Sequence, residues 1–282
     1  MLLKRKTSAE TLKLQEKYGV PYLVFPSLEN TGLVHHAFST RLGGCSTGDL
    51  ATMNLSSTRG DDPENVKENF QRFGAAVGFD PKDLVLSLQT HTTNVRLVTE
   101  EDRGKGFTRP RDYKDVDGLI TNVPGLVLAT FYADCVPLYF VDPVHRAIGL
   151  SHSGWRGTVN RMGEVTLQRM KEAFGTRPSD VWTAIGPSIC QDCYEVSEDV
   201  AQEFISAFEG WADNRLLYRK ENGKYQLNLW RANELVLLES GVPKDRIAVT
   251  DICTCCNPQV LFSHRASKGK RGNLGAFLQL LS

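Results

Sequence analysis

Three residues whose side chains bind metal ions or act as nucleophiles, His91, Cys135 and His152, each lie at the end of a predicted strand. A thiolate and imidazoles brought together at strand ends suit Zn²⁺ or copper, and they equally suit a Cys–His nucleophile pair. A His/Cys/His set leaves one tetrahedral position for water or substrate, which a catalytic zinc needs and a structural zinc lacks. The alternative is a buried free cysteine with satisfied core histidines, the commoner state of a lone Cys–His pair.

Two of these residues belong to one predicted β-hairpin. Residues 136–141 and 146–150, which are mostly apolar, predict two strands, and Asp142-Pro143 between them predicts a tight turn. If the strands pair antiparallel, Cys135 and His152 meet at the open end of the hairpin. The third residue, His91, follows another predicted strand, 84–88, and Gln89 points to the same face as His91 if that strand continues.

A second group of candidate ligands lies near the C-terminus. Cys253, Cys255 and Cys256 follow a predicted strand, 247–252, and His264 comes shortly after them. These residues could hold another metal ion, but their spacing matches no zinc knuckle, and adjacent Cys255 and Cys256 would point to opposite faces of a strand. Buried thiols are the favoured interpretation of this group.

Two loops could contact a ligand. Arg41-Leu42-Gly43-Gly44 combines a cation with glycines that let backbone N–H groups approach an anion, although an ordinary surface turn has the same composition. Residues 100–114 are charged and rich in helix breakers, so they predict a surface loop that either closes over the site or simply extends into solvent.

The composition limits the class of protein. Lys+Arg and Asp+Glu are equal at 33 each, which gives no support for a nucleic-acid or anionic-membrane partner. No apolar run reaches membrane-spanning length, and the N-terminus lacks the apolar core of a signal peptide, so we expect a cytoplasmic protein. In that compartment the 7 cysteines are expected to be reduced thiols or metal ligands.

The pattern of elements predicts one mixed α+β domain over residues 21–282, with residues 1–20 as an N-terminal extension carrying a polar helix at 8–18. Asp62, Pro63 and Gly78 are start and stop signals for a helix whose apolar stripe is core. Strands are expected in runs rather than in alternation with helices, which favours mixed sheets packed with helices. Two of the expected strands lie near the C-terminus, at 259–262 and 276–281.

Five motifs in this order closely resemble the YfiH family, long labelled polyphenol oxidases or laccase-domain proteins, and within it the bacterial YlmD branch. They are Gln89-Thr90-His91, Asp117-Gly118, Ala133-Asp134-Cys135-Val136-Pro137, His152-Ser153-Gly154-Trp155-Arg156-Gly157 and Phe262-Ser263-His264-Arg265. The resemblance extends from about residue 20 to the C-terminus.

The resemblance implies an α+β sandwich of mixed sheets, similar to the cytotoxic-necrotizing-factor catalytic fold. It implies a metal, usually zinc, on His91, Cys135 and His152. It also implies purine nucleosides and phosphate as substrates, with phosphorolysis of inosine, adenosine and methylthioadenosine and deamination of adenosine. Older work on the family assigned copper-dependent phenol oxidation, and another branch is linked to the removal of misincorporated serine from peptidoglycan precursors.

Further residues are candidates for roles in this chemistry. A carboxylate is expected to shuttle protons, with Asp134 as one candidate and Asp117 as another, although strand alternation would also allow Asp134 to be a structural acceptor. Arg41 and Arg265 are expected to contact phosphate or ribose, Gln89 and Asn54 are expected polar contacts, and Arg156 is expected to stack on Trp155. The family often has Thr-Gly-Arg before its last strand, where this chain has Arg271-Gly272-Asn273. Asn273 cannot replace the missing charge, but Lys270 or Arg271 could.

Three other functions remain open. Cys135 as nucleophile with His91 or His152 as base would give an amide or thioester hydrolase. A metal-binding interaction protein would carry zinc without turnover. A copper oxidase is less favoured, because multicopper oxidases need several His-rich sites and this chain has only 6 histidines.

Overall fold

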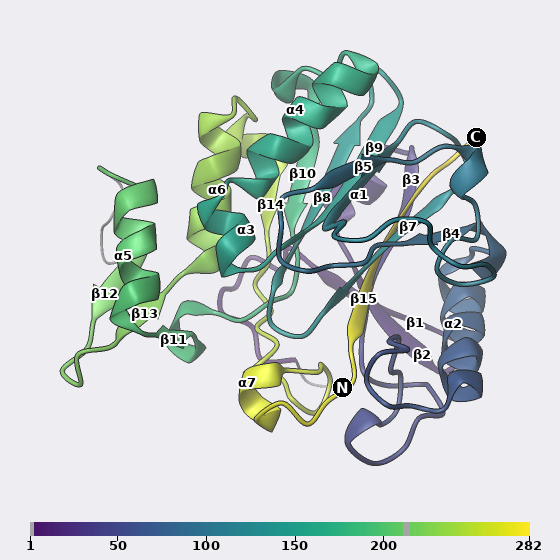
Figure 1. Ribbon diagram of the computed structural model, residues 1–282, viewed down its shortest axis with the longest axis horizontal. Helices are drawn as coiled ribbons and strands as arrows, with labels where there is room; N and C mark the ends of the chain where they lie inside the picture. Colours follow the sequence, from purple (N-terminus) through teal and green to yellow (C-terminus); the bar gives the residue numbers. More distant parts are fainter. Residues whose placement is uncertain (1–2, 211–214) are drawn as a thin grey trace.

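The computed structural model describes residues 3–210 and 215–282, and two six-stranded mixed sheets pack face to face at its centre (Figure 1). The strands of the first sheet are β1 (Lys13–Lys17), β2 (Val20–Val24), β3 (Val34–Ser39), β15 (Leu274–Leu280), β7 (Val127–Tyr132) and β4 (Leu84–Leu86), in spatial order. Those of the second sheet are β14 (Ile247–Val249), β10 (Trp182–Ile185), β8 (Val136–Asp142), β9 (Ala147–Ser153), β6 (Gly118–Thr121) and β5 (Val95–Leu97).

Residues that alternate along the central strands separate two cores. On β8, Tyr139 and Val141 point between the sheets, whereas Leu138 and Phe140 point toward the helices on the outer face. All four are fully buried, which explains why this strand is apolar throughout rather than alternating with polar residues.

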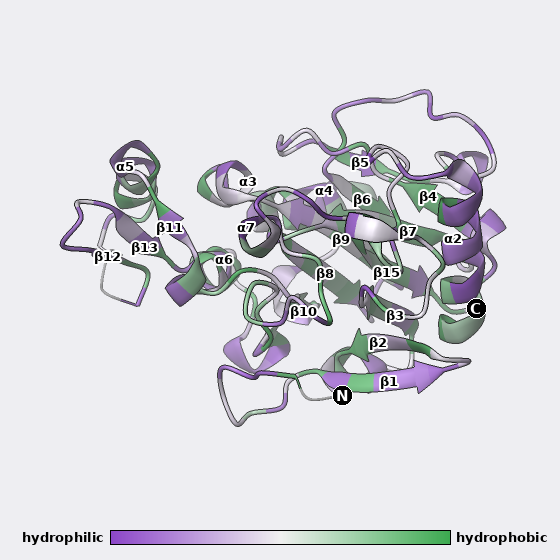
Figure 2. Ribbon diagram, turned by 90° about the horizontal axis from the view of Figure 1, so that it is seen from below, coloured by the Kyte–Doolittle hydropathy of each residue, from purple (hydrophilic) through white to green (hydrophobic). Residues whose placement is uncertain are grey.

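Helices cover both outer faces. Helix α2 (Pro63–Val77) packs Phe70 and Phe73 against the first sheet, and Asp62 caps it by accepting a hydrogen bond from the Glu64 N–H. On the second sheet lie α3 (Trp155–Val159), α4 (Met162–Phe174) and α6 (Leu229–Glu239). Figure 2 shows the resulting layers, with hydrophobic strands inside and the hydrophilic side of α2 facing outward.

A smaller lobe extends from one end of the molecule (Figure 1). It contains α5 (Glu198–Ala207) and a three-stranded sheet of β11 (Glu195–Val196), β13 (Tyr225–Leu227) and β12 (Leu217–Arg219). The remaining helices are α1 (Pro26–Glu29) and α7 (His264–Ser267).

The predicted α+β fold of mixed sheets between helices is confirmed, as is the hairpin of β8 and β9. Two expected elements are wrong. Residues 13–17 of the expected helix form β1, because pairing with β2 outweighs their local helix preference. Residues 259–262 form turns, with the Val260 and Leu261 N–H groups donating to the Asn257 carbonyl. The boundary between an extension and a domain at residue 20 stays a prediction, and the β1–β2 hydrogen bonds cross it.

In residues 3–210 and 215–282, every helix is too short or too polar to traverse a lipid bilayer.

His36 on β3 is a buried histidine with one paired ring nitrogen and one that is unpaired in the described part of the chain. Its Nε2 accepts a hydrogen bond of 2.8 Å from the Phe25 N–H, and its Nδ1 has no partner among the described residues. Burial, followed by the charge of His35, lowers the pKa of His36 to about 3. The folded protein therefore holds this imidazole neutral, because a proton on Nε2 would oppose the Phe25 N–H.

We predict that the free energy of unfolding falls as the pH decreases from about 6.5 toward about 3, since only the unfolded chain binds a proton at His36 in that range. The slope from this group is about 1.4 kcal/mol per pH unit. Urea unfolding of His36→Gln, which keeps an acceptor without the titration, should show a shallower pH dependence than wild type. The exposed neighbour His35 provides the control: His35→Gln should keep the wild-type slope, and equal slopes in all three proteins would contradict the assignment.

Candidate metal centre and active site

His91, Cys135 and His152 converge where the two sheets meet. His91 follows β4, Cys135 lies in the crossing from β7 to β8, and His152 is on β9 opposite Pro137. Their three possible ligand atoms lie within 4.8 Å of one another, and Cys135 Sγ is 4.0 Å from His91 Nε2. The two imidazoles are nearly perpendicular, with ring centroids 5.0 Å apart.

This arrangement fits a single metal ion. Zn–N and Zn–S bonds in a tetrahedral site place neighbouring ligand atoms roughly 3.3–3.8 Å apart, so small side-chain movements would bring all three onto one ion. His91 is exposed and His152 is buried, so the centre has one open side and one protein side. The three residues could therefore hold a metal while leaving a position accessible to substrate.

The buried carboxylate of Asp117 orients both histidines. Its Oδ1 accepts hydrogen bonds from the His91 N–H at 3.0 Å and from His152 Nδ1 at 2.9 Å. Its Oδ2 accepts from the Thr90 N–H and from the N–H and hydroxyl of Thr92, each at 3.0 Å. A carboxylate on Nδ1 leaves His152 Nε2 free to bind a metal. Burial acts to raise the pKa of Asp117, but the hydrogen bonds and charge of His152 outweigh it and lower the pKa, which keeps the group ionised.

Cys135 and His152 form a polarised Cys–His pair. Burial acts to raise the pKa of the Cys135 thiol, but His152 and His91 outweigh it and lower the pKa to about 6. Burial acts to lower the pKa of His152, but the charge of Cys135 and the hydrogen bond to Asp117 raise it to about 9. The thiolate, which is the form that binds metals or attacks a carbonyl, is therefore favoured near neutral pH.

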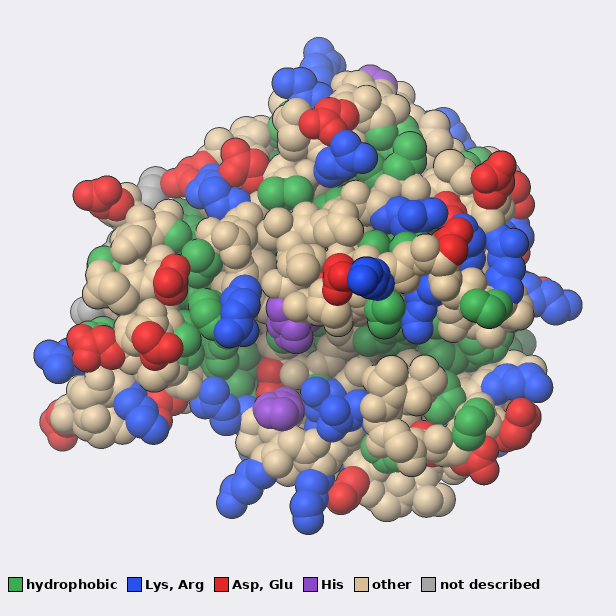
Figure 3. Space-filling view, in the orientation of Figure 1, with side chains coloured by type: hydrophobic (Ala, Val, Ile, Leu, Met, Phe, Trp, Pro, Cys, Tyr) green, Lys and Arg blue, Asp and Glu red, His purple; other side chains and the backbone are tan. Residues whose placement is uncertain are grey.

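The three residues line a cavity of about 670 Å³, within the size range of small-molecule sites. Figure 3 shows a hollow across this face, with histidine and Lys or Arg side chains at its edges. Residues of α2 form one wall, and Gly106, Phe107, Thr108 and Arg111 of the predicted 100–114 loop form another. That loop therefore borders the cavity.

Gln89 also lines the cavity, yet its amide already has protein partners. Its Oε1 accepts from the Phe131 N–H at 2.7 Å and from the Ser87 hydroxyl, and its Nε2 donates to the Phe131 carbonyl at 2.8 Å. The side chain thus acts like an additional strand residue beside β7.

Among the described residues, the cavity lining does not include the other predicted polar contacts, Arg41, Arg265 and Asn54. Arg41 donates to the Ala51 and Pro258 carbonyls and stacks on the Phe262 ring. Arg265 donates to the Cys193 and Glu195 carbonyls. Asn54 is fully buried and bonds to the backbone of Ser56 and Asn273.

Asp134 points away from the three candidate ligands. Its carboxylate accepts from the Thr254 hydroxyl at 2.6 Å and from the Arg265 N–H at 2.7 Å. The expected stacking of Arg156 on Trp155 is confirmed, with the guanidinium 4.3 Å from the ring centroid.

Two arginines in the cavity lining were not predicted as ligand contacts from the sequence. Arg111 was not singled out, and Arg271 was considered only as a replacement for the family arginine. Arg271 Nε is buried without a partner among the described residues. Burial, followed by the charge of Arg59, lowers the pKa of Arg271 to about 10. An anion next to Arg271 would supply the missing acceptor and the missing negative charge. The motif Arg271-Gly272-Asn273 was the signal for this position.

The second predicted group of ligands has a different composition from the one expected. Cys253 and Cys256 lie with Cys190 and Cys193, whereas Cys255 and His264 are outside this group. The missed signal was a pair of C-x₂-C motifs, Cys190–Cys193 and Cys253–Cys256, far apart in the sequence.

We predict that Gly154→Ala damages the centre without changing the fold. The added Cβ would lie 2.9 Å from the His91 ring and 3.3 Å from Cys135 Sγ, while the φ of −72° at Gly154 suits alanine. Metal retained after dialysis should decrease, with a melting temperature close to that of wild type. Gly125→Ala is the control, because no atom lies within 4 Å of its added Cβ. Gly125 has a positive φ, so this variant measures the effect of backbone strain at a position away from the centre. Full metal retention in Gly154→Ala would contradict this geometry.

Comparison with known proteins identifies relatives over most of the chain. The purine nucleoside phosphorylase YlmD of Bacillus subtilis (strain 168) is 35% identical over 254 residues, which cover 89% of this chain and 90% of that protein. The purine nucleoside phosphorylase of Bacteroides thetaiotaomicron is 37% identical and is matched over 93% of its length, against 89% of this chain. The adenosine deaminase RL5 of an unknown prokaryotic organism is 33% identical, covering 81% of this chain and 87% of that protein.

Solved structures agree with these relatives. YlmD of Geobacillus stearothermophilus superposes with a TM-score of 0.86 at 33% identity, covering 95% of this chain and 99% of that one. YfiH of Bacillus licheniformis gives a TM-score of 0.88 at 30% identity, with the same coverage. Residues 35–281 match the family described as multi-copper polyphenol oxidoreductase laccase. The chain therefore belongs to this laccase-type family, as its YfiH-like motifs predicted.

Proposed function

We propose that this chain is a zinc-dependent purine nucleoside enzyme that splits inosine, adenosine and methylthioadenosine with phosphate and also deaminates adenosine. The names of its relatives, two purine nucleoside phosphorylases and one adenosine deaminase, support the substrate class. The observation that carries the proposal is the meeting of two imidazoles and a thiolate on the wall of a cavity that also contains an arginine with an unpaired, buried Nε.

In this proposal His91, Cys135 and His152 hold the zinc ion. Zinc, when bound with one open position, supplies a Lewis acid and lowers the pKa of water. Asp117 is a positioning residue, because both its oxygens are used by the loop of His91 and by His152. Asp134, whose oxygens are bound by Thr254 and Arg265, positions the segment that carries Cys135.

Phosphate would bind near Arg271. Its unpaired Nε provides a donor, and the same cavity lining contains the hydroxyls of Ser57 and Thr58 and a second cation, Arg111. In phosphorolysis a phosphate oxygen forms a bond to C1′ of the ribose while the bond from C1′ to the purine nitrogen breaks. The electron pair leaves with the purine, which takes up a proton. A cation beside phosphate holds the nucleophile against the ribose and screens it from competing water.

The lowered pKa of Cys135 favours a second candidate, a Cys–His hydrolase that acts on an amide. In that case Cys135 would attack the carbonyl directly and no metal would be needed. Dependence on metal separates this candidate from the nucleoside enzyme.

We predict that purified protein releases free base from inosine, adenosine or methylthioadenosine only when phosphate is present, with ribose 1-phosphate (or its methylthio analogue) as co-product. The protein should also convert adenosine to inosine in the absence of phosphate. Chelation should abolish both activities and added zinc should restore them. Cys135→Ala should lose both the metal of this site and turnover, with kcat/KM reduced at least roughly 100-fold. Cys45→Ala, whose thiol contacts Asn65 and Asn69 on α2, should keep both.

Other outcomes of this assay would reject the proposal. Activity that survives complete chelation but is lost in Cys135→Ala would indicate the hydrolase. A zinc-loaded protein without nucleoside turnover would indicate a metal-binding interaction protein. Oxidation of phenols by a copper-loaded protein, without nucleoside cleavage, would indicate the oxidase implied by the family's description.

We predict that Arg271→Gln raises the KM for phosphate roughly 10- to 100-fold, because a charge-assisted hydrogen bond contributes about 1.5–3 kcal/mol. The KM for nucleoside and the deamination of adenosine should change little. Lys270→Gln is the matched control, since this neighbouring cation is exposed and lies outside the cavity lining. An unchanged KM for phosphate in Arg271→Gln would place the phosphate elsewhere in the cavity.

A further inference from the structure

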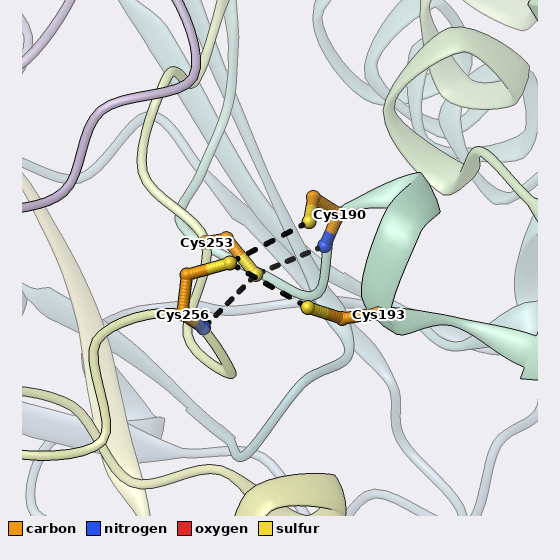
Figure 4. Close-up of side chains that lie close together, drawn as sticks. All are labelled: Cys190, Cys193, Cys253 and Cys256. Atoms are coloured by element: carbon orange, nitrogen blue, oxygen red, sulfur yellow. Dashed lines mark hydrogen bonds between the residues drawn. The ribbon is translucent and has the colours of Figure 1, made fainter.

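Four cysteines from two distant segments meet beside the small lobe. Cys190 and Cys193 precede β11, while Cys253 and Cys256 lie between β14 and α7. The four sulfur atoms lie within 4.8 Å of one another, and Figure 4 shows that they point toward a common centre. We propose that these residues form a second metal site, a structural zinc bound by four thiolates.

The sulfur distances agree with one ion. A tetrahedron of Zn–S bonds near 2.3 Å places neighbouring sulfurs about 3.8 Å apart. Cys190 Sγ lies 3.9 Å from Cys256 Sγ, and Cys193 Sγ lies 3.5 Å from Cys256 Sγ. A disulfide would bring two of the sulfurs to about 2.05 Å, and an iron–sulfur cluster would spread the thiolates over several irons and hold them farther apart.

Backbone hydrogen bonds to sulfur supply an independent observation. The Cys190 N–H donates to Cys253 Sγ at 3.2 Å, and the Cys256 N–H donates to the same sulfur at 3.4 Å. Such bonds stabilise a thiolate rather than a thiol. The bond from Cys256 folds the 253–256 segment around its own sulfur, and the bond from Cys190 links the two segments. A β-bridge between Ser188 and Cys253 sets these segments side by side.

The surroundings shield half of the group from water and place one lysine close to it. Cys190 and Cys253 are buried, and Cys193 and Cys256 are partly exposed. Zn²⁺ with four thiolates carries a net charge of about −2, and Lys6 reaches over from the N-terminal segment, where its Nζ lies 2.7 Å from Asp192 between Cys190 and Cys193. Two residues earlier, the Lys4 N–H donates to Asn257 Oδ1 and the Lys4 carbonyl accepts from Asn257 Nδ2.

All four ligands are supplied and no ligand position is left for substrate, so this ion would be structural. It would join two segments, the start of the small lobe and the loop that leads to α7, and the N-terminal residues 4–6 contact both of them through Asp192 and Asn257. This role differs from that of the open His91/Cys135/His152 centre, and it holds whether or not the proposed nucleoside chemistry is correct.

Metal content of full-length protein, purified under reducing conditions and dialysed, tests the site. We expect two equivalents of zinc per chain in wild type and the loss of one equivalent in either Cys190→Ser or Cys256→Ser. Cys135→Ser should lose the other equivalent, so the two sites are counted separately. Cys255→Ser is the matched control, because it changes a cysteine of the same turn that is outside the group of four, and it should keep both.

Cobalt substitution keeps the test decisive if a serine variant fails to fold. Wild-type protein reconstituted with Co²⁺ should show the strong sulfur-to-cobalt charge-transfer absorption of a tetrathiolate site, and the Cys135→Ser variant should retain most of it. Metal content unchanged in Cys190→Ser and Cys256→Ser would overturn the proposal. So would a cobalt spectrum that Cys135→Ser abolishes, a disulfide between any two of the four cysteines in freshly isolated protein, or iron in place of zinc at the same stoichiometry.

Discussion

The geometry of the candidate active site depends on one buried carboxylate. Asp117 precedes β6 and accepts five side-chain hydrogen bonds, from Thr90, His91, His152 and twice from Thr92. These bonds hold His91 at a φ of +67°, a conformation that a residue with a side chain adopts only when its surroundings enforce it. They also fix which nitrogen of His152 faces Cys135. A buried charge is tolerable only when it is fully paired, so the loop at 90–92 and the histidine of β9 cannot move independently.

The parts of this arrangement that follow from local sequence could be predicted. The hairpin of β8 and β9 is two apolar stretches around Asp142-Pro143, and helix α2 has its signals at Asp62, Pro63 and Gly78. Elements whose state depends on distant partners could not be predicted. Residues 13–17 form a strand only because β2 offers an open edge, and Val260 and Leu261 turn because Asn257 accepts their N–H groups. The same distinction applies to the cysteines, since Cys190 and Cys253 meet through long-range contacts, the β-bridge between Ser188 and Cys253 and the bond from the Cys190 N–H to Cys253 Sγ.

Cations in loops were the least predictable candidates for the site. A sequence shows that Arg41 and Arg265 have donors, but it does not show which acceptors are nearest. In the structure both guanidinium groups bond to main-chain carbonyls and lie over aromatic rings, Phe262 and Tyr194 respectively. Arg271 differs because folding buries it beside the cavity and leaves its Nε without a partner. An unpaired donor in a cavity wall is a stronger indication of an anion site than an arginine in a glycine-rich loop, since burial without a partner has a cost that a ligand can remove.

The two groups of metal-ligand candidates are mechanically connected through Asp134. This residue has a φ of +91° immediately before Cys135, and its carboxylate is bound by the Thr254 hydroxyl and the Arg265 N–H. Thr254 itself follows Cys253, so an ion held by the four cysteines would fix the loop that restrains Asp134. The backbone at Cys135 would then be held from two directions, by β8 on one side and by the cysteine-anchored loop on the other. A reactive thiolate on a crossing between two sheets needs such support, because a catalytic constellation tolerates displacements of only a fraction of an ångström. An ion at the proposed four-cysteine site would therefore help to position the open centre, through the loop between β14 and α7.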